Sequence, residues 1–90
     1  MKIKIESPCS ASTIIKYGIK NWPVWEGEPS TFKWSYQEKE TCLIIQGEAQ
    51  IKSSFGTYTI KSGDLVVFPN GFSCIWEITK TIKKHYRIGE

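Results

Sequence analysis

The sequence has little of what would indicate a disulfide-linked, secreted or membrane protein. Its three cysteines are an odd number without paired spacing, which argues against a disulfide framework and indicates a reducing compartment. The first residues, MKIKIESP, alternate charged and apolar side chains, so we expect neither a signal peptide nor a membrane segment. Together these absences predict a cytoplasmic protein.

The chain also has little excess of positive over negative charge. Twelve basic and nine acidic residues leave a net charge of +3, too small to indicate a polyanionic partner. Histidine, the commonest metal ligand, occurs once. The chain is instead rich in aromatic residues, four each of tryptophan, tyrosine and phenylalanine, which either fill a core or line a pocket. Ninety residues support one modest core, so we expect residues 1–90 to form a single domain.

Alternation of apolar and polar residues predicts an all-β chain. Phe32, Trp34 and Tyr36 share one face of a half-buried strand. A nearly continuous apolar run after Glu40 predicts a buried strand that turns at Gly47 into the next one. This pattern gives about eight or nine short strands along the chain, which is typical of a sandwich or barrel.

At most one short helix is expected, near the N-terminus. Ser10 or Ser12 can cap a helix that runs through residue 17, and Gly18 ends it. Pro23 then disfavours helix in the residue before it and predicts an extended segment, in which Trp25 needs burial. The helix is therefore an addition to the β structure and not part of its core.

The stretch GDLVVFPNGFSCIW, residues 63–76, predicts two strands and a tight turn. Pro69 ends the first strand because proline has no N–H for the ladder. Asn-Gly at positions 70–71 is a strong hairpin signal. The chain then returns in a strand in which Cys74 and Trp76 share one face. We therefore expect a β-hairpin at this point.

The spacing of these turn residues resembles the cupin family. Gly63, five residues, Pro69, one residue, Gly71, two residues and Cys74 are similar to the second cupin motif, and Glu40-x6-Gly47 is similar to the end of the first. The resemblance implies a single cupin-type β-barrel, or jelly roll. In both motifs the ligands of a bound metal ion are mainly histidines. Here the three histidine positions hold Trp34, Tyr36 and Cys74.

A longer pattern resembles one branch of this family. W-x-Y before E-T-C, then G-D-x-V-x-F-P-x-G, C-x-W and a terminal K-K-x-Y are similar to small single-domain cupins related to the cupin domain of ureidoglycine aminohydrolase. That resemblance implies chemistry on a small nitrogenous molecule. The aminohydrolase is a two-cupin manganese enzyme, and its metal ligands have no counterpart in this sequence.

The candidate site follows from the shared parity of residues on strands that a cupin barrel would point inward. The alternative is that the aromatic rings fill the core, the thiols behave as small buried apolar groups and the glutamate lies on the surface. The residues predicted to line one interior pocket are Trp34, Tyr36, Glu40, Cys42, Cys74 and Trp76.

Three functions are compatible with this pocket. The first is binding of a small polar or nitrogenous molecule without metal. The second is a hydrolase or isomerase that acts on a small nitrogenous substrate with Glu40 as acid or base, with or without a metal ion. The third, single-stranded nucleic-acid binding, ranks last because it needs exposed aromatic rings beside Lys80, Lys83, Lys84 and Arg87.

The expected partner is thus a small-molecule ligand, with no nucleic acid and no membrane. We predict no metal and no other cofactor, because Glu40 and Cys74 alone cannot complete a coordination shell. A homodimer through sheet edges stays open, since cupins often associate in this way.

Overall fold

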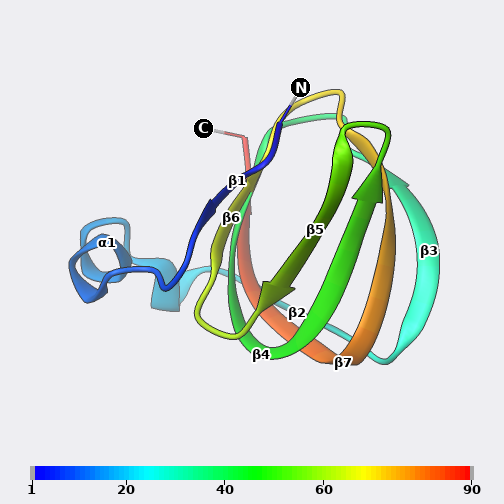
Figure 1. Ribbon diagram of the computed structural model, residues 1–90. Coiled ribbons are helices and arrows are strands. Elements are labelled where there is room, and N and C mark those ends of the chain that lie inside the picture. Colours follow the sequence, from blue (N-terminus) through cyan, green and yellow to red (C-terminus); the bar gives the residue numbers. More distant parts are fainter. Residues whose placement is uncertain (1, 90) are drawn as a thin grey trace.

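The computed structural model describes residues 2–89. Seven strands form a β-barrel, and two short helical segments lie beside it (Figure 1). This confirms the predicted all-β, single-barrel fold with one short N-terminal helix. Within residues 2–89, no helix has the length and apolarity needed to cross a membrane. The elements are β1 (Lys4–Glu6), α1 (Ala11–Lys16), the 3-10 helix η1 (Ile19–Asn21), β2 (Val24–Gly27), β3 (Ser30–Ser35), β4 (Glu40–Ser53), β5 (Gly56–Lys61), β6 (Leu65–Phe68) and β7 (Ser73–Ile88).

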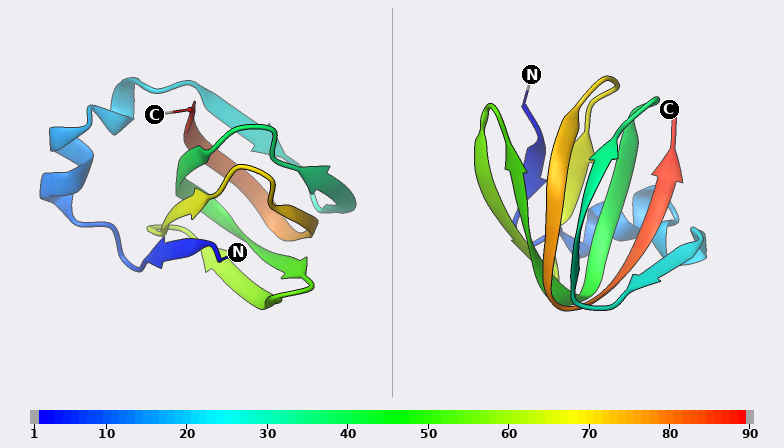
Figure 2. Two further views of the ribbon diagram at one scale, coloured as in Figure 1. Left: turned by 90° about the horizontal axis from the view of Figure 1, so that it is seen from above. Right: turned by 90° about the vertical axis from the view of Figure 1, so that its right-hand side faces the viewer.

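Two long bent strands, β4 and β7, hold the barrel together. They are antiparallel partners, and each continues from one half of the barrel into the other (Figures 1 and 2). The first part of β4 pairs with β6, and β6 pairs with β1. The second part of β4 pairs with β5, while β7 pairs first with β3 and then with β2. All of these pairings are antiparallel. Their order places β1, β6 and β2 in one half of the barrel and β5 and β3 in the other.

Gly47 allows β4 to bend. Its φ is +94°, and a Cβ at this position would lie 2.0 Å from the carbonyl oxygen of Thr81 and 2.7 Å from that of Lys80 on β7. The register with β7 shifts between Ile44 and Ala49, as in a β-bulge, and such irregularities bend a strand and increase its twist. The turn predicted at Gly47 is therefore wrong. It is a bend within one strand, and the described residues form seven strands where about eight or nine short ones were expected.

The Asn-Gly turn is confirmed, but the hairpin predicted around it is wrong. Phe72 N donates to Pro69 O at 3.2 Å, which closes a turn. The flanking strands β6 and β7 are not neighbours, because β4 lies between them in the sheet. Instead Gly71 N donates to Tyr36 O at 2.7 Å, and Tyr36 N donates to Phe72 O at 2.8 Å. The turn thus crosses between the two halves of the barrel and fixes the main chain after β3.

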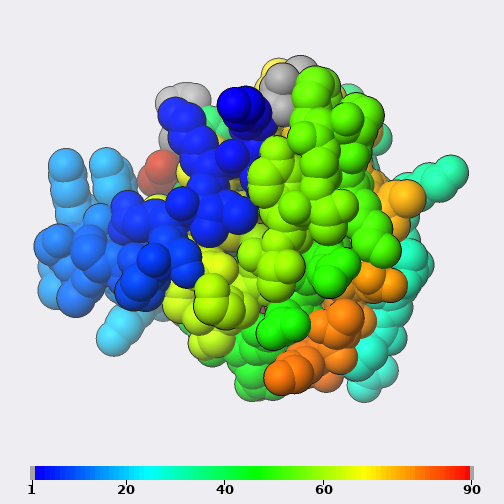
Figure 3. Space-filling model, viewed as in Figure 1, coloured from blue at the N-terminus to red at the C-terminus, as the bar shows by residue number. Residues whose placement is uncertain are grey.

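The predicted helix begins and ends as expected. The Ser10 side chain accepts from Thr13 N at 3.2 Å, and Gly18 adopts a left-handed φ of 60° after the last turn. No residue of α1 is buried. The helix projects from one side of the barrel, as the space-filling view shows (Figure 3). It therefore contributes little to the core.

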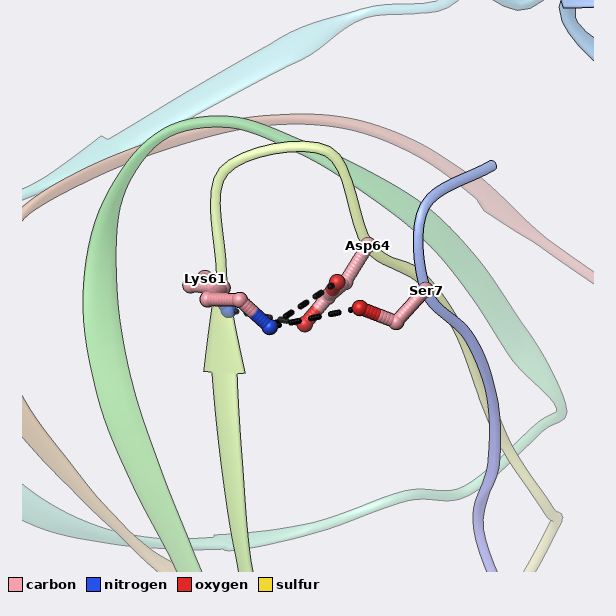
Figure 4. A network of polar contacts seen from close by, with 3 residues as sticks. All are labelled: Ser7, Lys61 and Asp64. Atoms are coloured by element: carbon pink, nitrogen blue, oxygen red, sulfur yellow. Dashed lines mark hydrogen bonds and ion pairs between the residues drawn. The ribbon is translucent and has the colours of Figure 1, made fainter. Parts of the chain in front are cut away.

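A buried aspartate ties the segment after β1 to the barrel (Figure 4). The Asp64 carboxylate accepts from Lys61 N at 3.0 Å, and the Lys61 ammonium lies 3.8 Å from its other oxygen. The same ammonium donates to Ser7 Oγ at 3.2 Å, and Cys9 N donates to Gly63 O at 2.7 Å. These contacts fasten the chain before α1 to the turn between β5 and β6.

The core lies between the two halves and consists mainly of aliphatic and aromatic side chains. It fills the barrel from the bend of β4 and β7 toward the turn that precedes β7. Its fully or almost fully buried members include Cys42, Ile44, Ile51, Ile60, Val66, Phe68, Phe72, Trp76 and Ile82.

Candidate functional site

A cavity of about 210 Å³ opens beside this core, where β2 and β3 approach the inner face of β7. Six of its nine lining residues are aromatic, and two of the other three carry opposite charges. Its walls therefore combine large apolar surfaces with one strongly polar spot. The lining residues are Trp25, Phe32, Trp34, Tyr36, Glu40, Trp76, Lys84, Tyr86 and Ile88.

The polar spot is an ion pair between Glu40 and Lys84. Lys84 Nζ lies 2.9 Å from Glu40 Oε2, and the two side chains are only 9% and 11% exposed. Glu40 begins β4 opposite Ile88, and Lys84 lies on β7 opposite Ile44, so the two long side chains extend toward each other along the inner face. Each charge thus has its partner without reaching bulk water.

Aromatic rings support the Lys84 ammonium from two further directions. Nζ lies 4.8 Å from the Trp76 ring centroid and 5.2 Å from that of Trp25. A cation over the face of a tryptophan is attracted by the ring quadrupole, most strongly where water is excluded. The two rings therefore hold the ammonium at the cavity wall and partly compensate its lost hydration.

The position of Trp25 depends on a glycine. A Cβ at Gly27 would lie 2.3 Å from the indole ring of Trp25, so only glycine leaves room for this ring over the strand. The ring contacts both Phe32 and Trp76, with centroids 6.4 Å apart in each case. Phe32 and Trp76 are themselves nearly parallel, with 5° between their planes. The result is a continuous aromatic wall formed by β2, β3 and β7.

Tyr36 connects this wall to the turn between β6 and β7. Its ring stacks on Phe68 at 4.5 Å, and its hydroxyl accepts from Trp76 Nε1 at 3.1 Å. Burial raises the pKa of Tyr36 well above the ordinary value of 10.0, and the nearby Glu40 charge raises this pKa further. The phenol therefore keeps its proton and can donate it to an acceptor.

Four of the six residues predicted for the site line this cavity, namely Trp34, Tyr36, Glu40 and Trp76. Trp76 is 2% exposed and forms part of the inner wall, whereas Trp34 is 52% exposed and lies at the mouth. The ring of Trp34 meets Tyr36 edge-on, with centroids 6.5 Å apart.

The other two, Cys42 and Cys74, do not line the cavity. Cys42 is completely buried in the core, where burial raises the pKa of its thiol to about 12 although the Lys84 charge opposes the shift. Cys74 borders a shallow depression beyond Trp34, and burial raises its pKa to about 11. Both thiols are therefore protonated at neutral pH. The alternation of residues along a strand predicts the face on which each cysteine lies. It does not predict whether the cysteine lies beside the cavity or elsewhere along that face.

Five residues that line the cavity were not predicted from the sequence as site residues. Lys84, Tyr86 and Ile88 continue the inward alternation of Trp76 along β7, so parity could have found them. Phe32 shares the inner face with Trp34, as expected, but was not included in the site. Trp25 gives no such signal, because it reaches the cavity only through the pairing of β2 with β7. In that pairing it lies opposite Lys84.

The residues present do not fit the transition-metal site that the cupin resemblance implies. In the described part of the chain, no three His, Cys, Asp or Glu side chains come together. Glu40 is bonded by an ammonium group, which repels a cation. The single histidine, His85, is bonded through Nδ1 to the carbonyl oxygen of Trp22 at 3.0 Å and does not line the cavity.

Comparisons with known proteins identify the family and agree with the fold. Residues 16–86 match the family described as EutQ-like cupin domain. The crystal structure of a DUF861 family protein from Thermotoga maritima is 36% identical and covers 97% of this chain and 99% of its own, with a TM-score of 0.92. Among curated proteins, no sequence matches the chain.

Two longer proteins share the fold at lower identity. A putative ethanolamine utilization protein Q from Salmonella typhimurium is 20% identical, and the EutQ protein of Clostridium difficile is 21% identical. Each aligns with 73% of this chain, with TM-scores of 0.67 and 0.68. The chain spans 54% and 52% of their lengths, so these two matches speak for the fold alone.

Proposed function

Because the chain belongs to the family of EutQ-like cupin domains, we propose that it binds a small polar, nitrogen-containing molecule in its aromatic cavity, without a metal ion. The observation that carries this proposal is the Glu40–Lys84 ion pair at the cavity wall. We place this function in the cytoplasm, where the unpaired thiols of Cys9, Cys42 and Cys74 would stay reduced.

Stability alone is a weak reason for such a pair. Replacing a buried ion pair by apolar residues of similar volume is often neutral or stabilising, because desolvation of the two charges offsets their attraction. Here the pair also borders open space instead of being enclosed by the core. A few polar groups in a largely apolar, concave wall are what small-molecule sites use to orient a ligand.

A catalytic role of Glu40 is the second candidate. The resemblance to ureidoglycine aminohydrolase implies a hydrolase or isomerase in which this carboxylate transfers a proton. Lys84 engages Oε2, while no described residue hydrogen-bonds Oε1, so Oε1 is the more accessible oxygen for proton exchange. None of the compared proteins described above carries an aminohydrolase name. We therefore rank binding above catalysis.

Blocking the cavity tests the proposal. Ile88 lines the cavity but is 55% exposed, so Ile88→Trp adds bulk at the mouth without overpacking the core. Ile15→Trp on α1, where the side chain is 80% exposed, is the matched control. Small polar fragments are screened by ligand-observed NMR in the presence of EDTA.

We expect fragments that bind the wild-type protein and Ile15→Trp, and that lose about tenfold or more of their affinity for Ile88→Trp. Equal binding to the Ile88→Trp variant, or binding that requires an added metal ion, would contradict the proposal. A screen without any cavity ligand would contradict it as well.

A further inference from the structure

The ion pair leaves both hydrogen-bond acceptors and donors open to the cavity. Lys84 bonds Glu40 Oε2, and no described residue bonds Oε1 of the same carboxylate. The ammonium group carries three N–H donors, of which one is hydrogen-bonded to Glu40, and its other described contacts are the cation–π contacts with Trp76 and Trp25. The cavity wall thus presents a carboxylate oxygen beside N–H groups that have no second hydrogen-bond acceptor among the described residues, on two side chains that are about nine-tenths buried.

The two opposite charges disfavour a charged ligand. An anion that approaches Lys84 also approaches the Glu40 carboxylate, and a cation that approaches Glu40 also approaches the ammonium group. Displacing either partner would leave its counterpart buried and unpaired, which is strongly unfavourable. A neutral ligand keeps the pair intact and adds charge-assisted hydrogen bonds to it.

The remaining walls favour a small planar molecule. The rings of Phe32 and Trp25 and the half-exposed ring of Trp34 offer flat apolar surfaces, and Phe32 is itself stacked on the almost fully buried Trp76. Rings of this kind attract planar groups in stacked or edge-on arrangements. At about 210 Å³ the cavity is smaller than the roughly 300 Å³ at which drug-sized sites begin, so one ring with one functional group fills it.

On the basis of the proposed function, we infer that the ligand is a neutral, planar molecule with a carboxamide-type edge. Its carbonyl oxygen accepts a hydrogen bond from Lys84 Nζ, and its adjacent N–H donates to Glu40 Oε1. The Tyr36 hydroxyl, which keeps its proton, adds a second donor near the carbonyl. The plane of the ligand lies against the aromatic wall.

Three probes of equal shape test the charge that the cavity prefers. Benzamide is neutral, benzoate is its anionic counterpart and benzamidinium its cationic one, and all three are planar. Binding is measured by isothermal titration calorimetry at neutral pH and low ionic strength in EDTA. We expect benzamide to bind about tenfold or more tightly than either ion. Equal or tighter binding of benzoate or benzamidinium overturns the inference, as does the absence of benzamide binding.

A double variant tests the role of the pair. Glu40→Gln with Lys84→Met removes both charges together, so no buried charge is left unpaired and the fold is retained. We expect benzamide affinity to fall about tenfold or more. The control is the exposed pair of Lys52 and Glu77, 3.2 Å apart, changed in the same way, with unchanged affinity. Unchanged affinity in the cavity double variant overturns the inference.

The wild-type complex gives a measure that does not depend on any variant. In a crystal structure with benzamide we expect the amide nitrogen beside Glu40 Oε1 and the carbonyl oxygen beside Lys84 Nζ. Any other orientation, or a ligand outside the cavity, overturns the inference. The proposed function has a separate criterion: it fails when Ile88→Trp leaves every fragment bound. The ligand class fails alone when fragments do bind in the cavity but the charged probe is preferred.

Discussion

Lys84 reaches along the inner face of the barrel to Glu40, and the two form an ion pair of 2.9 Å although their side chains are only 9% and 11% exposed. The pair joins the start of β4 to the second half of β7, two strands that are already neighbours in the sheet. A buried charge that loses its partner is costly, whereas loss of both charges is not. Single and double variants of this pair can therefore separate its effect on stability from its effect on ligand binding.

The first prediction follows from that difference. Lys84→Met leaves the Glu40 carboxylate buried without a partner and lowers the free energy of unfolding by about 3–5 kcal/mol. The double variant with Glu40→Gln recovers most of this loss, because no charge remains to be desolvated. Urea denaturation monitored by tryptophan fluorescence measures both values. A single variant as stable as the wild-type protein would contradict the buried pair.

The second prediction concerns the hydroxyl of Tyr36. Tyr36→Phe removes the acceptor of the Trp76 indole N–H and leaves that buried donor unpaired, so we expect a loss of about 1–3 kcal/mol. Tyr17→Phe at the C-cap of α1, where the residue is 49% exposed, is the control and changes stability by no more than about 0.5 kcal/mol. Equal stability of the two variants in urea would show that the hydrogen bond does not form.

The third prediction tests the bend in β4. Gly47→Ala places a Cβ against the carbonyl oxygens of Thr81 and Lys80 and also requires a positive φ. We expect a loss of more than about 4 kcal/mol or failure to fold. Gly56→Ala shares the positive φ but meets nothing closer than 4.0 Å, so its loss is limited to the backbone strain of about 1–3 kcal/mol. Similar losses in both variants would exclude the close approach at Gly47.

The outcome at Gly47 also illustrates what the sequence could not predict. A glycine before a polar residue is compatible with a turn and with a bulge inside a strand. Only the pairing of β4 with β7 over both halves decides between them. The Asn-Gly signal at residues 70–71 was ambiguous in the same way. It correctly placed a turn, but the partners of the flanking strands depend on β4, which lies far away in the sequence.

The sequence indicated which face of the strands carries the site, but not which side chains are in contact there. The alternation from Phe32 to Tyr36 correctly placed a wall of rings on one side of β3, and Glu40 lies at its expected inner position. Lys84 was considered as part of a basic surface, because lysine is almost never fully buried without a partner. That partner, Glu40, is 44 residues away in sequence and is brought near only by the register of β4 with β7.

The fourth prediction is a loss of stability in alkaline solution. The pKa of Cys42 is raised from an ordinary value of 9.0 to about 12, so above pH 9.0 the unfolded state loses a proton that the folded state keeps. The folded state then binds more protons, and the free energy of unfolding falls with rising pH, by up to about 1.4 kcal/mol per pH unit, until the folded thiol ionises near pH 12.

Cys42→Ala removes this contribution. The variant loses some stability at neutral pH through the missing sulfur, but its free energy of unfolding should fall less steeply than that of the wild-type protein above pH 9.0. Cys9→Ala, at a thiol that is only partly buried, is the control and keeps a slope closer to that of the wild-type protein. Parallel pH profiles of the Cys42→Ala variant and the wild-type protein would contradict the shifted pKa.

The most direct test of the account is an NMR titration of the four indole N–H groups with benzamide in the presence of EDTA. Trp25, Trp34 and Trp76 line the cavity, whereas Trp22 packs against Arg87 at 4.9 Å and is not among the lining residues. We predict saturable shifts of the three cavity indole signals with an unchanged Trp22 signal. Shifts that are absent, that include Trp22 equally, or that appear only after a metal ion is added would contradict a metal-free binding site in this cavity.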